Sequence, residues 1–154
     1  WDYIIAINLT TPFKMIKETL PIMRKNKWGR IINISSVHGS VASQFKSGYV
    51  SSKHGLVGLT KVIALETAKE NITCNAISPG FVDTELVKKQ IKNLSKKKGV
   101  SFNKISNNLL KEKHPSMNFI KKDDVSSLAY YLTTNQASQI TGSNLIIDGG
   151  WTAQ

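Results

Sequence analysis

Three side chains in the first part of the sequence could together move a proton to or from a substrate oxygen. Ser36 precedes Tyr49 by thirteen residues, and Lys53 follows Tyr49 by four. A phenol has a pKa of ~10 in water, and a neighbouring ammonium group favours the phenolate, while a serine hydroxyl can donate to a substrate oxygen. The three residues therefore predict acid–base chemistry at a hydroxyl or carbonyl group. The same spacing also arises by chance, with the tyrosine in a core and the lysine on the surface.

The elements around these residues favour a shared site. Apolar side chains recur at three- and four-residue spacing over 3–27, which predicts a long helix with local irregularity near Pro12 and Pro21. Residues 30–35 form a β-branched run without clean alternation, which is typical of a strand covered on both faces. A second helical pattern covers 47–68. It would carry the tyrosine and the lysine on one face, because they are four residues apart.

The alternation of helices and strands continues to the end of the sequence. The further elements predicted are a strand over 72–77, helices over 85–97, 107–113 and 123–132, and a strand over 144–147. This order predicts an α/β fold with a doubly wound parallel sheet. In such folds, ligands bind beyond the carboxyl ends of the strands, and we expect Ser36, Pro79 and Gly80 to lie there.

The positive charge is concentrated in one segment. The formal net charge is +11, and residues 88–122 contain eleven lysines against one acid, Glu112. Clustered lysines can neutralise phosphates, so a nucleic-acid-binding module is one alternative function. The segment has one aromatic residue, Phe102, before the terminal Phe119, so base stacking has little support. We expect no nucleic-acid partner and interpret the lysines as a solvated surface.

Composition sets further bounds. A chain of 154 residues with 40% apolar composition can form one globular unit. No apolar run is long enough to span a membrane, and the single cysteine, Cys74, suits a reducing compartment, so we expect a cytoplasmic protein without a membrane partner. Neither a metal site nor a signal peptide is predicted. The sequence starts with Trp1 in an apolar, helix-like stretch, so we expect it to be part of a longer protein.

Four short motifs resemble, in order and spacing, the signatures of the short-chain dehydrogenase/reductase family. They are NISS at 33–36, YVSSK at 49–53, NAISPG at 75–80 and DGG at 148–150. The resemblance covers essentially the whole chain and implies a Rossmann-like fold, of which residues 1–154 are the C-terminal catalytic portion. It also implies a helical substrate lid at about 84–121. The glycine-rich cofactor-binding half is absent from this sequence, so we expect it upstream and do not expect the segment alone to bind NAD properly.

The resemblance assigns roles to individual residues. The implied catalytic residues are Asn8, Ser36, Tyr49 and Lys53, with Tyr49 as the acid/base, Lys53 lowering its pKa, Ser36 binding the reacting oxygen and Asn8 holding a relay water near Lys53. The implied cofactor contacts are Tyr49, Lys53, Pro79, Gly80, Val82 and Thr84. Other interpretations stay open for the last four, because Pro-Gly is also an ordinary turn and Thr84 an ordinary helix N-cap.

Further positions narrow the resemblance to the 3-hydroxybutyrate dehydrogenases of that family. Their substrate pocket corresponds to Ser36, His38, Lys46, Tyr49, Gln90 and Trp151 in this sequence. The resemblance implies reversible, NAD-dependent oxidation of the small 3-hydroxy acid (R)-3-hydroxybutyrate to acetoacetate, by a homotetramer. His38, Lys46 and Gln90 supply donors of the kinds that hold a carboxylate, although each could instead be an ordinary surface or loop residue. Phe81 departs from the pattern, in which we expect a tryptophan.

Alternatives within the family also stay open. A 3-oxoacyl-carrier-protein reductase would present a basic surface to an acidic carrier protein and would usually use NADPH. The residues that separate NAD from NADP recognition lie outside this sequence, so NAD is expected from the resemblance alone.

Overall fold

Three parallel strands form the centre of the protein, whose structure is a computed structural model describing residues 1–153. Their order in the sheet is β1-β2-β3, and the pairing places Ile34 beside Ile77 and Pro79 beside Ile147. The strands are β1 (Gly29–Ile34), β2 (Ile72–Pro79) and β3 (Asn144–Ile147). The predicted α/β fold with a parallel sheet is therefore confirmed.

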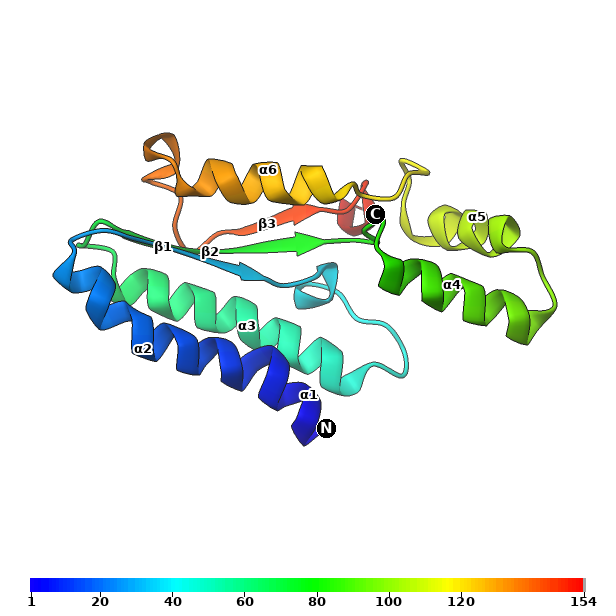
Figure 1. Cartoon of the computed structure of the whole chain (residues 1–154), viewed down its shortest axis with the longest axis horizontal. Coiled ribbons are helices and arrows are strands. Elements are labelled where there is room, and N and C mark those ends of the chain that lie inside the picture. The colour runs from blue at the N-terminus through cyan, green and yellow to red at the C-terminus, as the bar shows by residue number, and fades with distance from the viewer. Residues whose placement is uncertain (154) are drawn as a thin grey trace.

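Helices cover both faces of this sheet (Figure 1). The helices α1, α2 and α3 lie on one face, α6 lies on the other, and α4 and α5 project beyond the carboxyl ends of the strands. Their bounds are α1 (Asp2–Ile5), α2 (Thr11–Lys25), α3 (Ser47–Glu66), α4 (Glu85–Lys98), α5 (Phe102–Lys113) and α6 (Lys122–Thr133). Parallel strands joined by helical crossovers require this layered arrangement.

Two apolar cores hold the layers together. The core between the sheet and α2 and α3 consists of Ile16, Leu20, Ile31, Ile63, Ala64, Ile72 and Cys74. The core on the α6 side is built around Ile77, Leu132 and Ala137. Every residue of β2 is buried, as expected for a strand covered on both faces. Burial raises the pKa of the Cys74 thiol to about 12, so this thiol is unreactive at neutral pH.

The N-terminal helical segment is interrupted where the sequence predicted irregularity. A π-helical turn, Ala6–Thr10, joins α1 to α2, and Pro12 follows it in the first turn of α2. Because proline has no amide proton, the helical hydrogen-bond pattern has a gap at this point, where the π turn meets α2. Pro21 lies inside α2 on its exposed side. The π turn carries Asn8, and such turns are frequent at functional sites.

Three details differ from the sequence prediction. The end of β1 is not covered, since Ile34 is 49% exposed at the edge of the sheet. The helix predicted over 107–113 begins earlier, at Phe102, because the Ser101 hydroxyl accepts a hydrogen bond from the Lys104 amide and caps it. The sequence patterns also missed three short 3-10 helices, Val37–Gly39, Asn135–Ala137 and Trp151–Ala153, which are too short to show a period.

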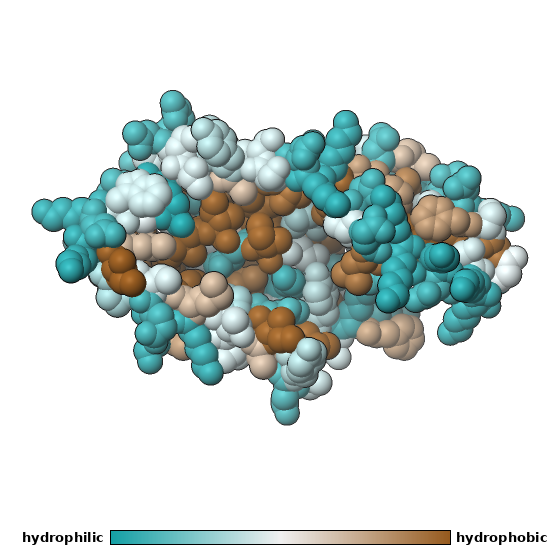
Figure 2. Space-filling model, viewed as in Figure 1, coloured by the Kyte–Doolittle hydropathy of each residue, from teal (hydrophilic) through white to brown (hydrophobic). Residues whose placement is uncertain are grey.

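The lysine-rich segment folds as a pair of amphipathic helices. Ile91 on α4 and Ile105 and Leu110 on α5 are buried, while polar side chains gather on the outside of both helices (Figure 2). Gly99 ends α4 in the left-handed conformation, which glycine adopts without strain. Within residues 1–153, no helix has the length and apolar character needed to cross a membrane.

We expect Ile77→Ala to lower the free energy of unfolding by about 3 kcal/mol, because it leaves a cavity between the sheet and α6. Ile146→Ala on β3 is the matched control, because Ile146 is 40% exposed and should cost less than about 1 kcal/mol. Urea denaturation of the intact protein measures both values. Equal losses would contradict the placement of the α6 core.

Candidate active site

The end of β1 positions a serine and a histidine. Ser36 follows β1 and caps the 3-10 helix Val37–Gly39, with its Oγ accepting a hydrogen bond from the His38 backbone amide at 3.2 Å. The same oxygen lies 3.4 Å from Nδ1 of the His38 ring. Both residues are buried. The turn after β1 therefore fixes the serine hydroxyl next to the imidazole.

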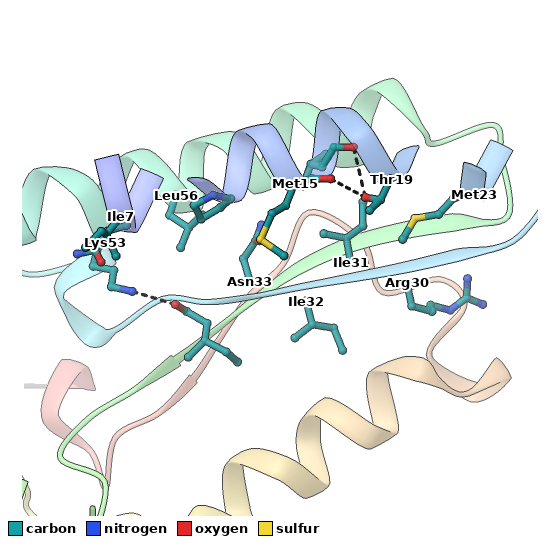
Figure 3. A pocket seen from close by; sticks show the side chains of 14 residues that line it. Ile7, Met15, Thr19, Met23, Arg30, Ile31, Ile32, Asn33, Lys53 and Leu56 are labelled. Atoms are coloured by element: carbon teal, nitrogen blue, oxygen red, sulfur yellow. Dashed lines mark hydrogen bonds between the residues drawn. The ribbon is translucent and has the colours of Figure 1, made fainter. Parts of the chain in front are cut away.

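The helix α3 brings a tyrosine and a lysine to the same place. Tyr49 and Lys53 lie four residues apart on α3, and Lys53 Nζ is 5.7 Å from the centroid of the Tyr49 ring. The ammonium group donates to the Ile34 carbonyl oxygen at 2.9 Å, so it spans from α3 to β1 (Figure 3). Burial lowers the pKa of Lys53. Because an ammonium has three protons, two remain for other acceptors.

One cavity of about 330 Å³ collects most of the residues that the sequence pointed to. Its lining comes from the turn after β1, the start of α3, the loop after β2, α4 and the C-terminal turn: Ser36, Val37, His38, Lys46, Tyr49, Gly80, Phe81, Leu86, Val87, Gln90 and Trp151. No acidic residue belongs to this lining among the residues the structure describes. The cavity combines two hydroxyl groups with donors suited to an anion.

His38 lines this cavity and is neutral at pH 7. Burial, together with the positive charges of Lys46, Lys113 and His54, lowers the pKa of His38 to about 4. Its Nε2 is 2.9 Å from the Ser43 hydroxyl oxygen. A neutral imidazole can donate from only one nitrogen at a time, so the ring can serve as a donor without adding charge.

Two further polar side chains line the cavity and come from different elements. Lys46 comes from the residue that precedes α3, and Gln90 comes from α4. Much of Lys46 is exposed, but burial of its ammonium group and repulsion from Lys113 lower its pKa. Among the described residues, the cavity wall has no carboxylate that would neutralise the Lys46 ammonium group. The site therefore attracts an anion.

Aromatic rings form the remaining wall. The His38 ring meets Tyr49 edge-on at a centroid distance of 5.7 Å and meets Trp151 at 5.4 Å. Phe81 lies 5.3 Å from Trp151. The phenylalanine keeps the wall aromatic where the resemblance led us to expect a tryptophan. The rings therefore enclose the hydroxyl groups in an apolar, shape-defining surface.

A buried carboxylate places Trp151. Asp148 follows β3 and accepts hydrogen bonds from the Gly150 amide at 2.9 Å and from the amide and hydroxyl of Thr152, both at 2.7 Å. Burial raises the pKa of Asp148, but the hydrogen bonds from Thr152 and Gly150 outweigh it, so the net pKa is lowered. The DGG motif thus works locally as the anchor of the C-terminal turn.

The loop after β2 lies beside the cavity, although only part of it lines the wall. Pro79 ends β2, and the Gly80 amide donates to the Ile147 carbonyl at 2.9 Å. Thr84 caps α4, because its hydroxyl oxygen accepts from the Val87 amide at 3.3 Å. Of the predicted cofactor contacts in this loop, only Gly80 lines the cavity. Pro79, Val82 and Thr84 stand outside its wall, and their contacts to a cofactor remain predictions.

Asn8 does not line the cavity of about 330 Å³. It lines a neighbouring cavity of about 400 Å³ along β1, together with Lys53, and the labelled side chains of that cavity are seen in Figure 3. The Asn8 amide donates to the Ser52 hydroxyl at 3.1 Å, and Ser52 in turn donates to the Tyr49 carbonyl at 2.7 Å. Asn8 therefore supports the first turn of α3, and its predicted water relay remains a prediction.

Sequence reasoning missed two residues near the site. His114 is completely buried behind Phe81, and Lys113 lies 5.5 Å from the centroid of the Trp151 ring. Both occur in the lysine-rich segment, where nothing in the local pattern sets them apart. Their position depends on how α5 returns to the sheet, which no sequence period encodes.

Comparison with known proteins finds relatives of the whole chain. A family model described as Enoyl-(Acyl carrier protein) reductase matches residues 1–152. Two curated relatives, the D-beta-hydroxybutyrate dehydrogenases of Rhizobium meliloti (strain 1021) and Cupriavidus necator, are each 49% identical to this chain over 154 residues. These alignments cover 100% of the chain, which spans 60% of the length of each relative. The solved structure of 4-hydroxyisoleucine dehydrogenase complexed with NADH matches with a TM-score of 0.86 at 38% identity, covering 97% of this chain and 58% of that one.

We expect the His38 imidazole to titrate near pH 4 instead of near its ordinary value of 6.5. Because the unfolded state binds the proton more tightly, the free energy of unfolding should fall as pH drops from 6.5 to 4. NMR of the ring protons gives the midpoint, and His38→Gln should remove this part of the pH dependence of stability. A midpoint near 6.5 would show that the ring is not held neutral by burial and nearby cations.

Proposed function

Because the chain belongs to the short-chain dehydrogenase/reductase family, we propose that the intact enzyme oxidises (R)-3-hydroxybutyrate to acetoacetate, reversibly, with NAD as cofactor. The observation that carries this proposal is the cavity whose lining combines Ser36 and Tyr49 with Lys46 and Gln90 and has no carboxylate among the described residues. The relatives named D-beta-hydroxybutyrate dehydrogenase support the choice of substrate.

In the proposed reaction, the two hydroxyl residues act on one substrate oxygen. Tyr49 accepts the proton of the substrate hydroxyl while a hydride leaves the carbon that carries it, and the carbonyl of the product forms. Ser36 donates a hydrogen bond to the same oxygen and holds it in place. The contact of Ser36 Oγ with the His38 amide supports this role, because it fixes the position of the serine oxygen at the cavity wall.

In the proposed complex, Lys53, Thr84 and Gly80 contact the nicotinamide end of NAD. Lys53 uses one proton on the Ile34 carbonyl, so two donors remain for ribose hydroxyls. The Thr84 hydroxyl accepts from Val87 and keeps its own proton for a phosphate or amide oxygen, and Gly80 exposes backbone without a side chain. NAD, when bound, supplies the hydride acceptor. The ammonium of Lys53, held beside the Tyr49 ring, would stabilise negative charge on the phenol oxygen.

In the proposed complex, three side chains of the cavity lining hold the substrate carboxylate. Lys46 provides the positive charge, and Gln90 and the neutral His38 provide directional hydrogen bonds. Gln90 comes from α4, which also lines the cavity with Leu86 and Val87. We propose that α4 and α5 form a lid whose contact with the substrate excludes water during the reaction.

The substrate assignment is tested by NADH formation in the intact enzyme. We expect turnover of (R)-3-hydroxybutyrate with NAD and at least tenfold less with the (S)-enantiomer, because only one enantiomer presents its hydrogen to the cofactor while its carboxylate reaches Lys46. NADP in place of NAD tests the cofactor.

Reduction of an acyl thioester with NADPH, without turnover of either hydroxy acid, would instead support a 3-oxoacyl-carrier-protein reductase. Salt-sensitive oligonucleotide binding with no dehydrogenase activity would favour the nucleic-acid-binding alternative.

The mechanism predicts that Tyr49→Phe lowers kcat by at least about 100-fold, because the change removes the proton acceptor and leaves the ring that meets His38. Tyr130→Phe on α6 is the matched control, since Tyr130 is 74% exposed and does not line the cavity. Steady-state kinetics and circular dichroism of both variants provide the comparison. Activity within twofold of the wild type in Tyr49→Phe would refute the proposed role.

A further inference from the structure

A fully buried histidine, His114, lies behind the cavity wall and has no part in the proposed chemistry. It caps the C-terminus of α5, within the lid predicted at about 84–121. Its Nε2 accepts a hydrogen bond from the Phe81 backbone amide at 3.0 Å, and its Nδ1 is 2.9 Å from the Asn118 carbonyl oxygen. An amide only donates and a carbonyl only accepts, so the ring carries its single proton on Nδ1.

The face of the same imidazole supports the aromatic wall. The rings of His114 and Phe81 are stacked at a centroid distance of 5.5 Å with an interplanar angle of 19°, and His114 lies 6.0 Å from Trp151. Phe81 and Trp151 both line the substrate cavity, whereas His114 does not. A Cβ atom on Gly80 would lie 2.6 Å from His114 Nε2, so the close approach of the imidazole requires glycine there.

We propose that His114 is a positioning residue that fixes the Phe81–Trp151 wall and thereby sets the length of hydroxy acid that the cavity accepts. It acts through the hydrogen bond to the Phe81 amide, which connects the end of the α4–α5 segment to the loop after β2. This inference rests on the proposed function, since the wall is expected to face the substrate's carbon chain.

The physical basis is the small number of hydrogen bonds that Phe81 itself makes within the loop. Phe81 is held by two backbone contacts, its amide to His114 and its carbonyl oxygen to the Ile120 amide at 2.9 Å. Loss of the first leaves the partly buried Phe81 amide without its acceptor, which favours a shift of the loop. A shifted loop moves the aromatic ring away from Trp151, and the cavity then fits a short substrate poorly and a longer one better.

Two variants of His114 separate the hydrogen bond from mere packing. The amide of His114→Asn can replace Nδ1 as donor to Asn118 but is too short to reach Phe81. The longer side chain of His114→Gln can place an amide oxygen where Nε2 accepts from Phe81. We expect His114→Asn to raise KM for (R)-3-hydroxybutyrate about fivefold or more, with kcat within about twofold, and His114→Gln to restore KM toward the wild-type value.

The selectivity for chain length is the second kinetic readout. The ratio of kcat/KM for 3-hydroxyhexanoate to that for 3-hydroxybutyrate should rise in His114→Asn and stay near the wild-type ratio in His114→Gln. Equal KM values and equal ratios in all three proteins would overturn the inference. A parallel loss of kcat in both variants, without a change in the ratio, would also overturn it, because that result indicates general damage to the fold.

Amide hydrogen exchange at Phe81 gives a readout that does not depend on any substrate. We expect the Phe81 amide to be protected in the wild type and in His114→Gln, and to exchange faster in His114→Asn. If this pattern holds but no hydroxy acid is turned over, the proposed function fails while the positioning of the loop stands. If the hydroxy acid is turned over but protection is the same in all three proteins, the inference fails and the proposed function stands.

If His114→Asn does not fold, the KM and the Phe81 amide protection of His114→Gln alone test the inference. Wild-type KM together with a protected Phe81 amide in that variant would support the hydrogen bond as the connection. Loss of both in a folded protein would overturn it, because the amide oxygen should be able to replace the ring nitrogen.

Discussion

The site depends on one constraint, which is the parallel pairing of the three strands in a specific register. It brings the carboxyl ends of β1, β2 and β3 to one edge of the sheet, where the residues just beyond the strands include Ser36, Gly80 and Asp148. The first provides a hydroxyl, the second a close-packed turn, and the third the anchor of the Trp151 turn. A shift of the strand register would move all of these groups, so sheet pairing and site geometry are coupled.

Charge then distinguishes this edge from an ordinary loop cluster. The cavity contains Lys46 and the neutral His38, and Lys53 and Lys113 are nearby, while the described part of its lining has no carboxylate. Uncompensated cations are unfavourable in a partly buried position, and a bound anion removes that cost. Burial is the largest cause of the lowered pKa values of His38, Lys46 and Lys53, and repulsion from nearby cations adds to it at His38 and Lys46.

Periodicity and residue spacing were sufficient to predict the regular elements of the fold. The strands, the helices and the shared position of Tyr49 and Lys53 came from apolar recurrence and the four-residue interval. The two-sided burial of β1 was wrong at Ile34, because burial there depends on which element covers the sheet edge. His114 could not be found in this way, since its contacts to Phe81 and Trp151 join segments more than thirty residues apart. The short turns that place His38 and Trp151 have no period at all.

The most direct measurement is a crystal structure of the intact enzyme with NAD and acetoacetate, a pair that cannot react. We expect the ketone oxygen to lie within hydrogen-bond distance of the Ser36 and Tyr49 hydroxyls, with the carboxylate held by Lys46 and Gln90 and the methyl group facing the Phe81–Trp151 wall. Acetoacetate bound in the opposite direction, with its carboxylate on Ser36 and Tyr49, would contradict the account. Acetoacetate bound outside this cavity would contradict it equally.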